Sequence, residues 1–232
     1  MADRSGLPST RRSAASDIDA FLDQAQVPAV PAGRGRLIFA MDATMSRQPT
    51  WDLAIRLQGR MFTETEALGG LDVQLVYFRG LAECRASRFV SGGAGLARVM
   101  AGIAVAGGNT QIGRVLSHAA QEAREARVGA LVFVGDALEE RLDPLCARAG
   151  ELALLGVKAF MFQEGASPQA ERGFQEIARL TSGCYASFDA AAPGRLAALL
   201  GAAAVYAAGG RAALARLPGD DAVAHNLLSQ LR

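Results

Sequence analysis

Short apolar runs alternate with longer amphipathic stretches along the chain from residue 36 onward. Each apolar run is bounded by glycine, proline or charged residues and is rich in Val, Leu, Ile and Phe, which predicts a buried strand. The stretches between the runs repeat apolar residues three and four positions apart, which is the period of an amphipathic helix. We expect six strands, at residues 36–42, 72–78, 84–90, 130–135, 157–162 and 184–188.

The order of these elements predicts the fold class. Strands separated by helices form βαβ units, so we expect an α/β protein with a doubly wound, mostly parallel, Rossmann-like sheet. The run at 84–90 roughly alternates polar and apolar residues after a tight turn, which predicts one antiparallel strand at the sheet edge. The predicted helices lie at about residues 50–68, 94–105, 110–127, 143–155, 167–183 and 193–210.

The two ends of the chain differ from this alternating region. We expect residues 1–33 to be a flexible N-terminal segment with one short amphipathic helix at 16–25, whose apolar residues share a face. The alternating region is expected to form one domain over residues 34–208, a length that suits a single α/β domain. A helical tail is expected to follow at residues 209–232.

Composition narrows the classes of function. Half of the 232 residues are hydrophobic and the formal net charge is only +1, which argues against nucleic acid as the main ligand. Cys84, Cys146 and Cys184 are scattered and odd in number, so they indicate a reduced compartment rather than disulfide bonds or a zinc site. The most membrane-like stretch, 196–208, is too short to cross a bilayer. We expect a soluble, bacterial-type cytoplasmic protein without a membrane partner.

Candidate chemistry begins where the first apolar run stops. The run from Arg36 ends in the carboxylate of Asp42, and hydroxyl side chains follow at Thr44 and Ser46. Oxygen atoms are the ligands that a small, hard divalent cation prefers. The alternative explanation for the same residues is a turn with helix-capping hydroxyl groups.

Two further segments supply similar side chains. The apolar run at 130–135 is followed by Asp136, and a glycine pair leads through Asn109 to Thr110 at the start of a predicted helix. In doubly wound sheets, ligands bind at the carboxyl ends of strands, where neighbouring connections leave on opposite faces. Thr110 alone could also be a helix cap. Together the segments predict a metal site formed by Asp42, Thr44, Ser46, Thr110 and Asp136.

Taken in this order, the segments resemble the von Willebrand factor A (VWA) family over about residues 34–208. In that family a D-x-[ST]-x-S sequence, a threonine and a later aspartate form a metal-ion-dependent adhesion site. The resemblance implies a stand-alone VWA domain of bacterial type, the strand order 3-2-1-4-5-6, and a bound Mg²⁺ or Mn²⁺. It also implies that the metal accepts a carboxylate from another protein.

The chain departs from the family pattern at three places. Thr44 stands where serine is common, and Ala137 follows Asp136 where glycine is common. Neither change removes a ligand atom. Asn109 and Thr110 occur in the reverse of the frequent order, so either residue could face the metal, and we favour Thr110.

The leading functional hypothesis is an intracellular, non-enzymatic protein-binding module that depends on a divalent metal and mediates protein–protein interaction or complex assembly. Three residues beside the motifs are candidates for its partner-binding rim, namely Arg47, Asn109 and Glu139. His118, two turns into the following helix, is expected to be a surface or partly buried residue rather than a ligand.

Two other hypotheses stay open. A magnesium-dependent hydrolase of phosphorylated small molecules would use Asp42 as nucleophile or metal ligand, and Arg47 is the only cationic side chain near it in sequence. The other hypothesis is a protein that binds its partner by surface shape alone and whose metal site is vestigial.

Overall fold

A computed structural model gives the arrangement of most of the chain. It describes residues 33–44, 47–189, 191–218 and 221–231. The predicted N-terminal helix at 16–25 and the candidate ligand Ser46 lie outside the described residues.

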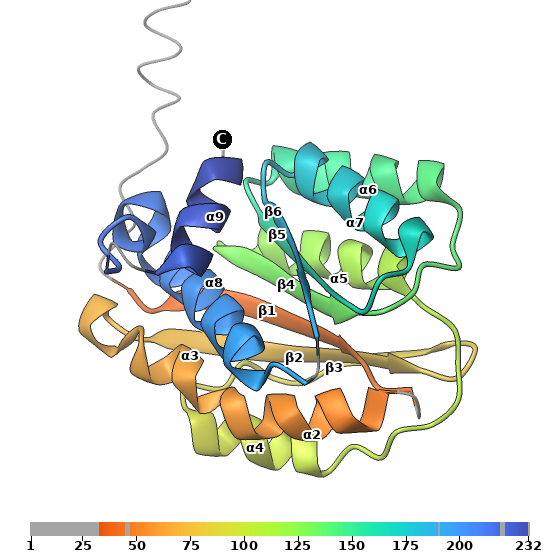
Figure 1. The fold of residues 1–232 in the computed structure, drawn as a ribbon, viewed down its shortest axis with the longest axis horizontal. Coiled ribbons are helices and arrows are strands. Elements are labelled where there is room, and N and C mark those ends of the chain that lie inside the picture. The colour runs from red at the N-terminus through yellow and green to blue at the C-terminus, as the bar shows by residue number, and fades with distance from the viewer. Residues whose placement is uncertain (1–32, 45–46, 190, 219–220, 232) are drawn as a thin grey trace, which may run out of the picture. The chain divides into compact units, whose positions relative to one another are not determined.

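The described chain contains a six-stranded sheet with the order β3-β2-β1-β4-β5-β6 (Figure 1). Neighbouring strands are parallel except β2 and β3, which pair antiparallel at one edge. The doubly wound α/β fold, its antiparallel edge strand and the expected strand order are therefore confirmed. The strands are β1 (Gly35–Asp42), β2 (Leu71–Arg79), β3 (Glu83–Ala86), β4 (Ala130–Gly135), β5 (Lys158–Glu164) and β6 (Cys184–Phe188).

Strand β3 is shorter than the strand predicted at 84–90, so the predicted length was wrong. Beyond Ala86, the backbone N–H of Leu75 donates to the Ser87 hydroxyl at 3.0 Å. A side chain thus takes a place that a backbone group fills in a regular ladder. The N–H of Ser87 still donates to the Leu75 carbonyl at 2.8 Å, and farther along Val90 and Val73 form an isolated bridge.

Helices cover both faces of the sheet. The predicted helix at 50–68 is divided into α2, α3 and a 3₁₀ turn. The first break lies next to Gly59, which agrees with the low helix propensity of glycine. A Cβ on Gly93 would lie 3.2 Å from the Cα of Gly59, so a neighbouring helix also packs closely at this break. The helical elements are α2 (Gln48–Leu57), α3 (Gly59–Thr63), η2 (Glu66–Leu68), α4 (Gly93–Ala101), α5 (Ile112–Glu125), α6 (Leu142–Leu154), α7 (Pro168–Leu180), α8 (Pro193–Leu214) and α9 (Ala222–Gln230).

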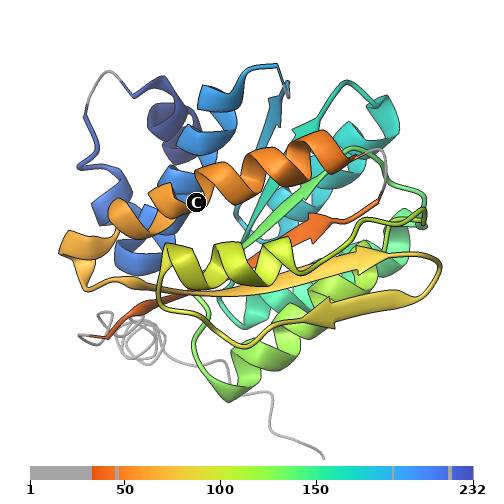
Figure 2. The same ribbon diagram turned by 90° about the horizontal axis from the view of Figure 1, so that it is seen from below.

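Alternate residues of each central strand point into two separate cores. Leu37 and Phe39 of β1 pack with side chains of α2, α3, α4, α8 and α9, whereas Ile38 and Ala40 pack with those of α5, α6 and α7. Figure 2 shows α2 and α4 on the near side of the sheet. The chain therefore leaves β1 toward one face, through α2, and leaves β4 toward the other, through α6.

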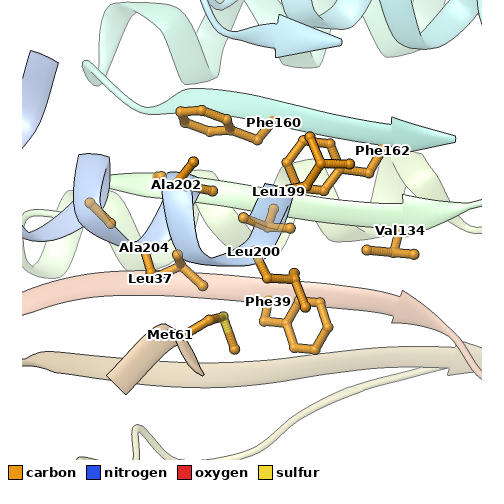
Figure 3. Close-up of a cluster of buried hydrophobic side chains, with 14 of the residues drawn as sticks. Leu37, Phe39, Met61, Val134, Phe160, Phe162, Leu199, Leu200, Ala202 and Ala204 are labelled. Carbon is orange, nitrogen blue, oxygen red and sulfur yellow. The ribbon is translucent and has the colours of Figure 1, made fainter. Parts of the chain in front are cut away.

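The first core is centred on α8. Its Leu199 and Leu200 lie against Phe39 of β1 and the rings of Phe160 and Phe162 of β5 (Figure 3). These side chains are buried, and Phe160 and Phe162 contact each other edge to face with ring centroids 6.4 Å apart. Burial of large apolar side chains on this scale is the main source of stability in such a domain.

Helix α8 approaches the sheet closely where the strands begin. A Cβ on Gly129 would lie 2.5 Å from the carbonyl oxygen of Ala207, and one on Gly35 would lie 2.5 Å from the Cα of Ala208. The alanine-rich sequence of the helix and the two glycines therefore form a close backbone contact. This contact fixes the amino ends of β1 and β4.

The C-terminal region belongs to the same compact unit as the sheet, Gly33–Arg232. The expected boundary at 208 falls inside α8, which continues through a kink at Gly210 (φ 68°). Leu227 of α9 is fully buried in the first core. By length and composition alone α8 is apolar enough to cross a membrane, but 67% of its most apolar window is buried against the rest of the protein.

Candidate metal centre

Three adjacent strands end in carboxylates. Strand β1 ends at Asp42, Asp136 follows β4 directly, and β5 ends at Glu164. Because β1, β4 and β5 are neighbours and parallel, the three carboxylates lie at one edge of the sheet. This edge is also the switch point of the fold, where the connections after β1 and β4 leave on opposite faces.

Asp42 is a buried anion, with 3% of its surface exposed. Its Oδ1 accepts a hydrogen bond of 2.8 Å from the backbone N–H of Thr44, which fixes the turn after β1. Burial raises the pKa of Asp42 to about 6; the hydrogen bonds from Thr44 oppose the rise, and the charge of Asp136 adds to it. Among the described residues, Asp42 forms no ion pair, so its charge is poorly compensated.

The loop that carries Thr110 is fixed by backbone contacts with the turn between β2 and β3. The N–H of Gly80 donates to the carbonyl of Gly107 at 2.9 Å, and the N–H of Asn109 donates to the carbonyl of Gly80 at 3.1 Å. A Cβ on Gly108 would lie 2.2 Å from the nitrogen of Gly80. Gly108 therefore allows two loops to touch, and the glycine pair has a packing function here.

Thr110 also binds the loop that follows β4. Its N–H donates to the Glu139 carboxylate at 2.8 Å, and its hydroxyl accepts the N–H of Glu139 at 3.1 Å. Thr110 is buried, whereas Asn109 and Glu139 are exposed. The structure thus brings the Thr110 and Asp136 loops together, and it leaves Asn109 and Glu139 at the surface where a rim residue would lie.

Glu140 caps α5, a role that the sequence did not predict. Its carboxylate accepts the N–H groups of Ile112 and Gly113, the latter at 3.0 Å. A negative charge at a helix N-terminus compensates the free N–H groups and the helix dipole. Helix α5 is therefore capped by a residue from a distant loop, which ties Thr110 further to the end of β4.

Arg47 is not a rim residue, which corrects the sequence-based expectation. It is only 1% exposed, because its guanidinium turns inward to an ion pair with Glu164. Its Nη1 lies 3.9 Å from Oδ2 of Asp136. Glu164 also accepts the hydroxyl hydrogen of Thr50 in the first turn of α2. The site therefore contains a buried cation and a third carboxylate, Glu164, that the sequence analysis did not single out.

The side chains at this edge are of the types that bind a hard divalent cation. Asp42 supplies a buried carboxylate that has no ion pair with any described residue, and Thr44, Thr110 and Asp136 are further oxygen ligands at the same edge. Among the described residues, no group of three or more His, Cys, Asp or Glu could hold a metal. A site here therefore relies on hydroxyl ligands beside two carboxylates, as a Mg²⁺ that keeps several waters permits.

Solved structures with the same architecture contain VWA domains. A von Willebrand factor type A protein from Catenulispora acidiphila has a TM-score of 0.61 at 15% identity, over 74% of this chain and 43% of that one. The conserved hypothetical protein BatB from Bacteroides thetaiotaomicron has a TM-score of 0.56 at 20% identity, over 72% and 97%. The SpRpn10 VWA domain has a TM-score of 0.56 at 12% identity, over 70% and 95%.

At these identities the likeness shows the fold, which is that of VWA domains. The chain spans less than half of the Catenulispora protein. No protein-family model matches the sequence, and no curated protein matches it.

Proposed function

We propose that this VWA-fold protein is a divalent-metal-dependent protein-binding module that acts inside the cell and carries out no catalysis. The proposed ligands of Mg²⁺ or Mn²⁺ are Asp42, Thr44, Ser46, Thr110 and Asp136. The observation that carries the proposal is the buried, poorly compensated carboxylate of Asp42 beside Asp136 at the switch point of the sheet. Solved neighbours with VWA domains support it at the level of the fold.

The chain's own residues have distinct roles in this proposal. Asp42 and Asp136 supply negative charge, while the threonine hydroxyls are neutral ligands that leave the metal electrophilic. The paired hydrogen bonds between Thr110 and Glu139 hold one ligand loop in position. These residues would hold a divalent cation, which when bound would supply positive charge that attracts a carboxylate of the partner protein. Asn109 and Glu139, both exposed, are the proposed rim.

The buried position of Arg47 favours binding over phosphate-ester hydrolysis. A hydrolase of phosphorylated small molecules needs a cationic side chain that grips the phosphate. Arg47, which ion-pairs with Glu164 and is almost fully buried, is not available for that role. An assay of phosphate esters with Mg²⁺ tests the point: turnover that is lost in Asp42→Asn would contradict the proposal.

Calorimetric titration tests the metal site directly. Protein treated with EDTA is titrated with Mg²⁺ and then Mn²⁺, with Asp42→Asn beside it and the exposed Asp143→Asn as a matched control. We expect one saturable site in the wild type and in Asp143→Asn, and none in Asp42→Asn. Equal binding by all three proteins, or by none, would contradict the assigned ligands.

A partner-binding assay then separates metal-dependent binding from binding by shape. Asp42→Asn and Asp136→Asn are expected to lose the partner to the same extent as wild-type protein in EDTA. Undiminished binding by both variants would mean that the metal site is vestigial.

A further inference from the structure

A guanidinium group lies among the carboxylates of the candidate metal centre. Arg47 belongs to the short segment between β1 and α2, and its Nη1 contacts Glu164 and lies 3.9 Å from Oδ2 of Asp136. The charge of Arg47 also acts on Asp42, whose pKa it lowers slightly against the larger effect of burial. One cation therefore faces the carboxyl ends of β1, β4 and β5.

Arg47 is incompletely satisfied in this position. Its Nε and Nη2 are buried and have no hydrogen-bond partner among the described residues. A guanidinium stays charged at any physiological pH, so it cannot avoid this cost by losing a proton. Buried groups with unused donors are expected where a site has more than one arrangement or awaits a further component.

A metal and Arg47 compete for the same negative charge. A divalent cation held by Asp136 would be repelled by a guanidinium 3.9 Å from that carboxylate, and the low dielectric of a buried site strengthens the repulsion. Glu164 offers Arg47 a second carboxylate one strand farther from β1. Thr50 holds Glu164 in place through its hydroxyl, so the start of α2 takes part in the same arrangement.

We propose that Arg47 is an internal counter-ion that competes with the divalent cation for Asp136, and that Glu164 retains Arg47 when the metal is bound. This inference rests on the proposed metal site. Arg47 and Glu164 then act as positioning residues that set metal affinity without touching the metal. Metal binding and the ion pair at the start of α2 are linked, and each must bias the other by the same factor.

The inference makes opposite predictions for the two partners of the ion pair. Arg47→Met keeps an unbranched side chain in place of the arginine methylene chain and removes the competing charge, so metal affinity rises. Glu164→Gln leaves Asp136 as the one carboxylate at ion-pair distance from Arg47 among the described residues, so the guanidinium competes more strongly and affinity falls. We expect each change to be at least about fivefold, the lower end of typical coupling between sites.

The experiment is a titration of EDTA-treated full-length protein with Mg²⁺ and Mn²⁺. Wild type, Arg47→Met and Glu164→Gln are compared with Arg36→Met, which breaks an arginine–glutamate pair at the other end of β1, 3.2 Å from Glu122. Circular dichroism and thermal unfolding verify that each variant is folded. If Arg47→Met does not fold, the test rests on Glu164→Gln. A metal affinity of Glu164→Gln within twofold of wild type then overturns the inference.

Tighter binding by Arg47→Met and weaker binding by Glu164→Gln, with Arg36→Met unchanged, is the expected result. Binding by Arg47→Met with none by the wild type also supports the inference, although it ends the claim that the native chain is metal-dependent. Wild-type binding with unchanged or equally weakened variants overturns the inference alone and leaves the metal site standing. No binding by any of the proteins overturns both.

Discussion

The two ends of the parallel sheet are built on different principles. At the amino ends of β1 and β4, Gly35 and Gly129 let the backbone of α8 approach closely, so the absence of side chains on two residues sets the packing there. At the carboxyl ends, Asp42 and Arg47 are charged and almost fully buried, and neither charge is fully compensated among the described residues. One end is arranged for packing, whereas the other contains groups that packing alone would not retain.

This difference indicates where stability and function lie in the molecule. Buried charges with unused hydrogen-bonding capacity weaken a fold, and proteins retain them mainly at sites that bind or react. Substitutions at the amino ends should therefore change the free energy of unfolding. Substitutions at the carboxyl ends should change metal binding.

The largest loss of stability is expected at the amino end, from Gly129→Ala. Its new Cβ would lie 2.5 Å from the carbonyl oxygen of Ala207, so backbone must move. We expect the free energy of unfolding to fall by about 1–3 kcal/mol, as in other overpacked cores. Urea denaturation measures it. Gly150→Ala in α6, whose Cβ meets nothing within 4 Å, is the control and should be neutral or stabilising. Equal stability of the two variants would contradict the claim that close packing at the amino ends stabilises the fold.

Gly108→Ala should have the opposite effect to Gly129→Ala, because it should change metal binding at the carboxyl ends more than it changes stability. The added Cβ would meet Gly80 at 2.2 Å and push the Thr110 loop away from the β2–β3 turn. We expect metal affinity to fall about tenfold, the lower end for residues that orient metal ligands, with a smaller effect on global stability. Gly107→Ala is the matched control, because its Cβ meets open space. If calorimetry finds the same affinity for both variants, the contact with Gly80 does not position the site.

The smallest expected effect comes from His118, which lies in α5 away from both ends. Burial lowers the pKa of His118, and Glu122 and Glu125 partly oppose this. The neutral ring donates from Nε2 to Oε1 of Gln74 at 2.9 Å. Because the unfolded chain takes up the proton more readily, the free energy of unfolding should fall as the pH drops through the ordinary value of 6.5.

His118→Gln should reduce this dependence on pH, while the exposed His225→Gln should keep it. Denaturation at a series of pH values provides the measurement. An unchanged slope in His118→Gln would assign the dependence to another group and contradict this account of His118.

Much of the fold followed from local patterns. The apolar runs located all six strands, and Asp42 and Asp136 were found because each stands directly after such a run. The end of β5 was missed because the strand continues beyond its apolar run through Gln163. That side chain is buried, and it is satisfied by donating to the Ser167 carbonyl at 3.0 Å and accepting from the Tyr185 hydroxyl at 2.8 Å. Its partners lie on other elements, so the sequence pattern ended too early and Glu164 was overlooked.

The position of Arg47 could not be predicted for a similar reason. An arginine next to a ligand motif and ahead of a helix is typical of a surface residue, since arginine is rarely buried without a partner. Its partner Glu164 is distant in the sequence and becomes a neighbour only through the order β1-β4-β5. The capping of α5 by Glu140 likewise depends on a contact between loops. Side chains whose roles depend on such contacts require the structure.

The most direct test of the central claim is thermal and urea unfolding of wild type and Asp42→Asn, each in EDTA and in excess Mg²⁺. Without metal, Asp42→Asn should be at least as stable as the wild type, because the substitution removes a buried charge and keeps the oxygen that Thr44 N–H binds. Free Mg²⁺ at about 100 times its Kd should stabilise only the wild type, by about 2.7 kcal/mol. A variant less stable in EDTA, or stabilised by Mg²⁺ as much as the wild type, would contradict the account of Asp42 as a buried ligand that awaits a cation.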